Sequence, residues 1–329
     1  MIPRAVIAGI EYYLPSRVVT NDDLAREFPE WGAEKIAEKT GIARRHIAAE
    51  GELSSDLAAA AAKKLFASGV VAQADIDYVL FCTQTPDFGL PTSACLLQHR
   101  LGIPTTAGAL DFNLGCSGYI YGLSLAKGLI ASGQARRVLL LTGETYSKLL
   151  DPKDKTVRTI FGDAGAATLV AADENGQASG IGEFAFGTDG SGGPNLVCHR
   201  GGHRGATAEA AGRDALWMNG PEIFNFTLKV VPAVVQTTLG KAGLSLEEVD
   251  VFVFHQANRY MLEHLRKKMR VPEEKFVVAM ENCGNTVSCS IPIALHEAQR
   301  AGRLRAGQRV MLVGFGVGYS WGATVVTWG

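Results

Sequence analysis

Two short sequence patterns occur twice in this chain at nearly the same spacing, and this repeat restricts the fold more than any other feature. The pattern IDYVLF at 76–81 resembles VDVFVF at 249–254, which lies 173 positions later. The pattern RVLLL at 137–141 resembles RVMLV at 309–313, which lies 172 positions later. Two matches at almost one offset predict a duplicated unit, although coincidence between two ordinary buried strands is the alternative.

Each half alternates short runs of β-branched residues with longer segments of helical spacing. Short and nearly continuous apolar runs are typical of strands in sheets that are covered on both faces. The expected strands lie at 5–10, 78–81, 138–141, 166–170, 251–254, 276–279, 310–313 and 324–327. The expected helices lie at 54–68, 117–132, 222–239 and 258–269. This alternation predicts a layered α/β fold.

The two halves are expected to meet in the turn-rich sequence DENGQ, which lies between 172 and 182. We therefore divide the chain into an N-terminal half at 1–177 and a C-terminal half at 178–329. Two similar halves can present the ends of corresponding strands to one shared cleft. Ligands of parallel sheets bind beyond the carboxyl ends of the strands, so the cleft between the halves is the expected site.

Charge and cysteine spacing exclude several classes of function. The 329 residues carry a formal net charge of −1, so no global attraction to nucleic acid or to an anionic membrane is expected. No run approaches the ~20 apolar residues that a membrane helix needs. The six cysteines form no C-x-x-C pair, and no metal site is expected. Without the long apolar core of a signal peptide, the chain is expected to be cytoplasmic with reduced thiols.

One cysteine lies in a sequence that suits a nucleophile. Cys116 stands in DFNLGCSGY, where an apolar strand ends and a helix of small and apolar residues begins. The N-terminus of that helix is expected to favour the thiolate, which is the nucleophilic form. Glycines on either side would let a substrate approach closely. The alternative is a buried structural thiol, which is the common state of a free cysteine.

Two further polar residues follow candidate strands in the C-terminal half. His255 ends the apolar run at 251–254 and begins HQAN, whereas Asn285 lies in the turn sequence CGNTV. A solvated loop histidine and a turn asparagine are the alternatives, and neither residue decides the function alone. Because all three residues follow strands, Cys116, His255 and Asn285 are expected to face one cleft.

Together these segments resemble the thiolase superfamily and, within it, β-ketoacyl-acyl carrier protein synthase III. The likeness runs across nearly the whole chain, and the Asn285 sequence matches the Cys-His-Asn subgroup. It implies a thiolase-like α-β-α-β-α fold made of two duplicated halves. The motifs that carry it are TGIARRH at 40–46, NLGCSG at 113–118, FGD at 161–163, HQAN at 255–258, GNT at 284–286 and GFGVGYSWG at 314–322.

The resemblance implies an acyltransferase that needs no metal or redox cofactor. Cys116 would attack an acyl thioester of coenzyme A or of acyl carrier protein and form an acyl-enzyme. The backbone N–H groups of Cys116 and Val317 would form the oxyanion hole. A malonyl thioester would then lose carbon dioxide while His255 and Asn285 donate hydrogen bonds to its carbonyl oxygen. The carbanion would attack the acyl-cysteine and give a 3-oxoacyl thioester.

The likeness also assigns substrate-binding positions, several of which depart from the family's usual residues. The tryptophan expected to stack on the adenine of coenzyme A aligns with Lys35, and Trp31, one helical turn away, is the candidate to replace it. Lys155 stands where arginine is common, and Arg259 lies beside another position usually held by arginine. Leu90 aligns with a residue that enters the acyl pocket of the partner subunit. The resemblance therefore implies a homodimer, and leucine here implies a longer or branched acyl group.

Two questions stay open at this level. The basic residues between 259 and 270 either dock an acidic acyl carrier protein or form a solvated helix face. The acyl group could also pass to an alcohol or amine without decarboxylation, as in natural-product or surface-polysaccharide assembly. The Gly-rich insert at 199–205 and the altered coenzyme A positions suggest this second reaction. A catalytically silent scaffold is disfavoured because the three catalytic positions are intact.

Overall fold

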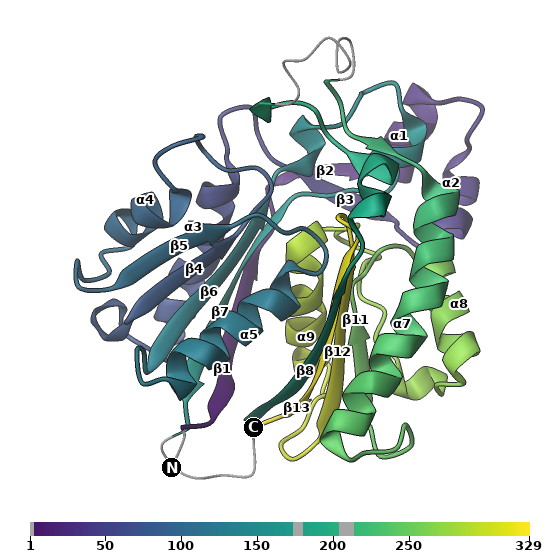
Figure 1. Cartoon of the computed structure of the whole chain (residues 1–329). Helices are drawn as coiled ribbons and strands as arrows, with labels where there is room; N and C mark the ends of the chain where they lie inside the picture. Colours follow the sequence, from purple (N-terminus) through teal and green to yellow (C-terminus); the bar gives the residue numbers. More distant parts are fainter. Residues whose placement is uncertain (1–2, 174–179, 204–213) are drawn as a thin grey trace.

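The computed structural model describes residues 3–173, 180–203 and 214–329, which form five alternating layers of helix and sheet (Figure 1). One sheet has the strand order β1-β7-β6-β4-β5, and the other has the order β11-β12-β13-β8. The strands of the first sheet are β1 (Ala5–Tyr13), β4 (Tyr78–Cys82), β5 (Gly108–Phe112), β6 (Arg137–Glu144) and β7 (Ala164–Ala172). Those of the second are β8 (Gly180–Thr188), β11 (Val251–Phe254), β12 (Arg309–Gly316) and β13 (Ser320–Thr327).

Helices form the other three layers. The helices α3 (Ser54–Ala67) and α4 (Ser93–Arg100) pack on the outer face of the first sheet. Between the sheets lie α5 (Gly118–Ala131) and α9 (Ser290–Arg300), while α7 (Gly220–Ala242) and α8 (Arg259–Met269) lie outside the second sheet. The predicted α-β-α-β-α arrangement is therefore confirmed. In the described ranges no helix has the length and apolar character to cross a membrane.

The strand pairing repeats as the sequence pattern does. In the first sheet β7 is antiparallel to both β1 and β6, while β4 is parallel to β6. In the second sheet β13 is likewise antiparallel to β8 and β12, while β11 is parallel to β12. Tyr78 pairs with Val138 and Val251 pairs with Val310, so the residues matched by the two offsets also occupy matching places. The boundary assigned between 177 and 178 falls outside the described residues and stays a prediction.

One expected strand is absent from the second sheet. Residues 276–279 form only an isolated parallel bridge, between Phe252 and Phe276, at the place that β5 holds in the first sheet. The side chain of Gln256 explains why the strand stops: its Nε2 donates to the Val277 carbonyl and its Oε1 accepts from the Ala279 N–H. These backbone groups are then not available to a ladder. The prediction of a strand here was wrong. The hydrogen bonds of its side-chain amide instead hold Gln256, the residue next to His255, in place.

Smaller elements complete the described chain near one end of the second sheet. The helices are α1 (Asn21–Glu27), α2 (Ala33–Thr40) and α6 (Lys155–Arg158). The strands are β2 (Arg17–Thr20), β3 (Arg44–Ile47), β9 (Leu196–Val197) and β10 (Trp217–Met218). Several 3-10 turns lie between them, including η7 (Val287–Cys289), which leads into α9. Residues of α2, α6 and β10 form one side of the cavity that contains Cys116.

Candidate active site

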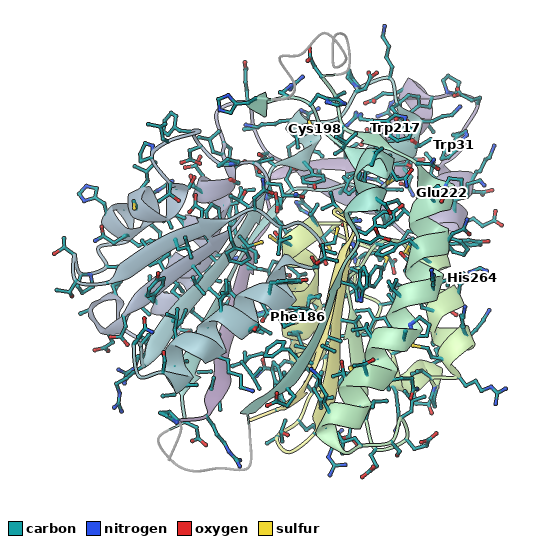
Figure 2. All side chains as sticks on the ribbon, in the orientation of Figure 1. Trp31, Phe186, Cys198, Trp217, Glu222 and His264 are labelled. Atoms are coloured by element: carbon teal, nitrogen blue, oxygen red, sulfur yellow. The ribbon has the colours of Figure 1, made fainter. Side chains whose placement is uncertain are left out.

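A cavity of about 470 Å³ contains the three predicted catalytic residues, Cys116, His255 and Asn285. Its apolar walls come from Ile160, Phe161, Leu196, Met218, Ile223, Met261 and Phe315. Trp31 and Lys39 lie at its other end, which Gly220 and Pro221 at the start of α7 also line; Figure 2 labels Trp31 and Glu222, the latter in the first turn of α7. The three polar groups come from both halves of the chain, so the fold brings them together at the joint between the two sheets.

Cys116 lies two residues before α5 and is 6% exposed. The backbone N–H groups of Cys116 and Val317 both lower the pKa of its thiol. Burial nevertheless dominates and, with the charge of Glu144, raises the pKa of the Cys116 thiol to about 12. The sequence led us to expect a favoured thiolate, and this was wrong because the loss of solvation outweighs the helix N-terminus.

Close backbone approach explains two glycines beside Cys116. A Cβ atom on Gly316 would lie 2.8 Å from the Cβ of Cys116 and 3.0 Å from its Sγ. A Cβ on Gly115 would meet the Oε1 of Gln84 at 2.4 Å and the Cγ1 of Val317 at 2.8 Å. Any larger residue at these positions would displace the neighbouring atoms. The end of β12 therefore packs directly on the turn that carries Cys116.

Substitution of Gly316 tests this packing. Gly316→Ala is expected to slow acylation of Cys116 by roughly 10²-fold, because a displacement of about 1 Å at a reacting group has an effect of that order. Single-turnover acylation followed by intact-protein mass spectrometry measures the rate. Gly240→Ala in α7 is the matched control, since nothing lies within 4 Å of its added Cβ. Wild-type acylation in Gly316→Ala would contradict the proposed close packing.

His255 follows β11 and is held from two sides. Its backbone N–H donates to the Val313 carbonyl at 2.8 Å, and its Nδ1 lies 2.7 Å from the Oγ of Ser290 in a hydrogen bond. The ring of Phe315 packs edge-on against the imidazole at 5.5 Å between centroids. Burial lowers the pKa of His255 to about 3. The imidazole is therefore neutral at physiological pH and can donate a hydrogen bond without adding a charge to the cavity.

Asn285 is fixed by both its backbone and its side chain. Its N–H donates to the Ile160 carbonyl at 2.9 Å, and its carbonyl accepts from the Gly162 N–H at 3.0 Å. The side-chain Oδ1 accepts from the Val287 N–H at 2.9 Å, which leaves the Nδ2 amide as the donor. Gly284 precedes it with φ +77° and with no room for a Cβ beside the Ile160 carbonyl, so this turn requires glycine.

A group of lysines surrounds Trp31 at the other end of the cavity. The Nζ atoms of Lys35, Lys39 and Lys155 lie 5.6, 6.0 and 5.6 Å from the centre of its ring. Three of the predicted substrate-binding residues thus meet at one place. Trp31 itself precedes α2, which begins at Ala33, so the helical-turn relation expected between Trp31 and Lys35 was wrong. Lys35, in the first turn of α2, still reaches the ring.

The other two predicted substrate-binding residues lie apart from this group. Arg259 begins α8, pairs with Glu281 at 3.6 Å and covers Gly41, where an added Cβ would meet its Cβ at 2.3 Å. Leu90 is 86% exposed and does not line the cavity of the single chain. The sequence-based prediction also missed Lys39 and Ser290. Lys39 directly precedes the TGI motif, but nothing in the sequence marks Ser290 as the partner of His255.

Several known proteins resemble this chain in sequence and in fold. Residues 110–190 match the family model described as 3-oxoacyl-[acyl-carrier-protein (ACP)] synthase III, and residues 239–328 match the model of its C-terminal part. A protein of Xanthomonas oryzae pv. oryzae named β-ketoacyl-[acyl-carrier-protein] synthase III is 40% identical over 97% of this chain and 97% of its own length.

Two crystal structures with similar names share the fold. A 3-oxoacyl-(acyl-carrier-protein) synthase III superposes with a TM-score of 0.97 at 54% identity, over 99% of this chain and 100% of its own. A 3-oxoacyl-(acyl carrier protein) synthase from Burkholderia xenovorans superposes with a TM-score of 0.92 at 39% identity, over 99% of this chain and 94% of its own.

Proposed function

Because this chain belongs to the 3-oxoacyl-[acyl-carrier-protein] synthase III family of the thiolase superfamily, we propose that Cys116, His255 and Asn285 are its catalytic residues. The enzyme is an acyltransferase that condenses an acyl group with a malonyl thioester to give a 3-oxoacyl thioester. The observation that carries the assignment is that three residues from two halves of the chain line one cavity.

In the first step the sulfur of Cys116 attacks the carbonyl carbon of the acyl thioester. A C–S bond forms, the carbonyl oxygen gains negative charge, and the N–H groups of Cys116 and Val317 bind that oxygen. The intermediate then releases the carrier as a thiolate, which takes the proton that Cys116 loses. The rest of the donor extends along the apolar cavity toward Trp31.

In the second step the bond between the malonyl carboxylate and its α-carbon breaks, and carbon dioxide leaves. The electron pair moves onto the α-carbon and the thioester oxygen, where the His255 ring and the Asn285 amide donate hydrogen bonds. The carbanion attacks the acyl-cysteine, and the Cys116 thiolate departs. Neutral donors suit this step because the charge develops on oxygen only as decarboxylation proceeds. The proposed reaction needs no external oxidant or reductant, and it needs no metal or redox cofactor.

Coenzyme A thioesters and acyl carrier protein are the proposed donors and partners. The cations around Trp31 are suited to the phosphates of a nucleotide, while the ring offers a stacking surface for its base. Glu30, which pairs with Lys155 at 2.7 Å, would have to release that lysine for a phosphate. For the carrier protein we propose the basic end of α8, where Arg266, Lys267 and Lys268 lie in the last turn.

A cytoplasmic homodimer is the proposed assembly. The edge strand β5 has one hydrogen-bonding partner in its sheet, β4, and Leu110 on it is 43% exposed. Phe88 and Leu90 are 58% and 86% exposed in the loop between β4 and α4. A second copy placed along β5 would extend the sheet and cover these apolar side chains. In that arrangement Leu90 enters the partner's acyl pocket and limits its size.

Product analysis tests the proposed reaction. Purified enzyme given an acyl thioester and a malonyl thioester is expected to release carbon dioxide and a 3-oxoacyl thioester in equal amounts. The Gly-rich insert that suggested an alcohol or amine acceptor extends outside the described residues. Transfer of the acyl group to such an acceptor in the absence of malonyl thioester would overturn the proposed condensation.

The same assay with Trp31→Ala distinguishes coenzyme A from acyl carrier protein as the acyl donor, because only coenzyme A thioesters are expected to show a higher KM.

A further inference from the structure

A carboxyl group that the proposed mechanism does not use lies buried behind the nucleophile. Glu144 is the last residue of β6, and its side chain is 0% exposed. Within the described ranges no lysine or arginine forms an ion pair with it. The titratable groups that face it are Asp163, the thiols of Cys82, Cys116 and Cys289, and the Tyr146 phenol. An acid among neutral or acidic neighbours is disfavoured as an anion.

Both oxygens of Glu144 are engaged by other segments of the chain. Oε2 accepts from the Gln84 backbone N–H at 3.1 Å and lies 3.5 Å from the Thr85 hydroxyl. Oε1 and the Oγ of Ser288 share a hydrogen bond of 2.8 Å. Gln84 and Thr85 belong to the N-terminal half, whereas Ser288 belongs to the C-terminal half. The carboxyl group therefore connects the two halves beside the cavity.

Each connected segment fixes part of the catalytic geometry. The side chain of Gln84 packs on Gly115, and its Nε2 donates to the Oδ1 of Asn113 at 3.1 Å, so this segment supports the turn before Cys116. Ser288 lies between Asn285 and Ser290, the residue that holds His255. A shift of one segment relative to the other would move the thiol of Cys116 away from the two donors.

We propose that Glu144 is a positioning residue for the condensation, whose carboxyl group holds the segment behind Cys116 against the segment that carries Asn285. The inference rests on the proposed roles of Cys116, His255 and Asn285. In the ionised form the Ser288 hydroxyl donates to Oε1. In the protonated form this bond reverses, so that Oε1 donates to the Ser288 oxygen while Oε2 still accepts from the Gln84 N–H. An amide has the same pattern of donor and acceptor, whereas an apolar side chain has neither.

Burial raises the pKa of Glu144 to about 8, so the acid is neutral below that pH. As the pH rises through this value, the carboxylate forms, and its negative charge makes ionisation of the Cys116 thiol less favourable. The same pKa lies above the value of an unfolded glutamate. The folded protein therefore binds the extra proton between about pH 4.5 and 8, and stability is lost as pH rises through that window.

The test compares Glu144→Gln with Glu144→Leu in the two half-reactions. Single-turnover mass spectrometry measures acylation of Cys116, and carbon dioxide release from malonyl thioester measures the second step on acylated enzyme. The leucine variant is expected to slow carbon dioxide release by roughly 10²-fold with KM little changed, and to slow acylation much less. The glutamine variant is expected to retain most of the activity at pH 7 and to lack the wild-type decline near pH 8.

The outcomes distinguish a positioning role of Glu144 from an effect on folding stability alone. Asp163→Asn is the matched control, because its buried carboxylate accepts from Ala48 and Ser147 instead. It is expected to change both steps by the same factor. Equal losses of both steps in Glu144→Leu, in proportion to the folded fraction, would overturn the proposal. If that variant does not fold, an unchanged decline near pH 8 in Glu144→Gln would overturn it. Failure of the wild-type enzyme to form acyl-Cys116 would instead contradict the proposed function.

Discussion

Cys116→Ala is expected to abolish the acyl-enzyme and to lower the condensation rate by at least about 10³-fold, an effect of the order found when a catalytic nucleophile is removed. The sulfur is the atom that the Cys116 and Val317 N–H groups face, and alanine leaves those donors without a nucleophile. Intact-protein mass spectrometry after exposure to an acyl thioester panel measures the adduct. Slow release of carbon dioxide from malonyl thioester is expected to persist, because His255 and Asn285 remain.

Cys283→Ala is the matched control for this experiment. Both thiols are 6% exposed, and burial raises the pKa of each to about 12, but Cys283 lies outside the cavity that contains His255. The control variant is expected to acquire the same mass increase as the wild-type enzyme. An adduct that survives in Cys116→Ala and disappears in Cys283→Ala would show that Cys283, and not Cys116, is the nucleophile.

The elements of this fold could be predicted where a buried strand or amphipathic helix leaves a periodic pattern. The repeated apolar runs located β4, β6, β11 and β12, and the structure pairs them as the offsets require. The missing strand at 276–279 could not be predicted in this way. Its apolar pattern is that of a strand, and only the folded chain shows that Gln256 takes the hydrogen bonds of Val277 and Ala279.

The site could be predicted in its residues but not in its electrostatics. Motif order indicated that Cys116, His255 and Asn285 would meet, because each follows an expected strand, although the one before Asn285 did not form. Their protonation depends on surroundings that are distant in sequence. Burial raises the pKa of the Cys116 thiol and lowers that of the His255 imidazole. Burial therefore favours the neutral form of both groups.

Because the His255 imidazole is neutral, the two steps of the proposed reaction are expected to depend on the donors to different extents. A charged imidazolium would stabilise the malonyl carboxylate before decarboxylation and so favour the ground state. A neutral imidazole and an amide interact weakly with the neutral thioester and strongly with the developing enolate. The apolar walls of Phe161, Leu196 and Ile223 lower the local dielectric and strengthen these hydrogen bonds. The second step should therefore depend on the two donors far more than the first.

Asn285→Asp tests this dependence with the smallest change of shape. The aspartate retains an oxygen for the Val287 N–H but replaces the Nδ2 donor with an acceptor that repels an enolate. Carbon dioxide release is expected to fall by about 10²- to 10³-fold, the effect of removing one donor to a developing oxyanion. Acylation of Cys116, measured by mass spectrometry on the same sample, is expected to change only a few-fold. Asn219→Asp is the control, because aspartate can replace that asparagine as the N-cap of α7.

His255→Ala is expected to have a similar effect on carbon dioxide release, and the double variant to lose less than the product of the two single losses. The donors act on one oxygen, so removing the first already removes much of what the second contributes. The pKa of His255 near 3 adds a second readout: no break in the rate near pH 6.5 is expected from this residue. If Asn285→Asp slowed acylation and decarboxylation equally, Asn285 would support the site as a whole and would not be a donor to the enolate.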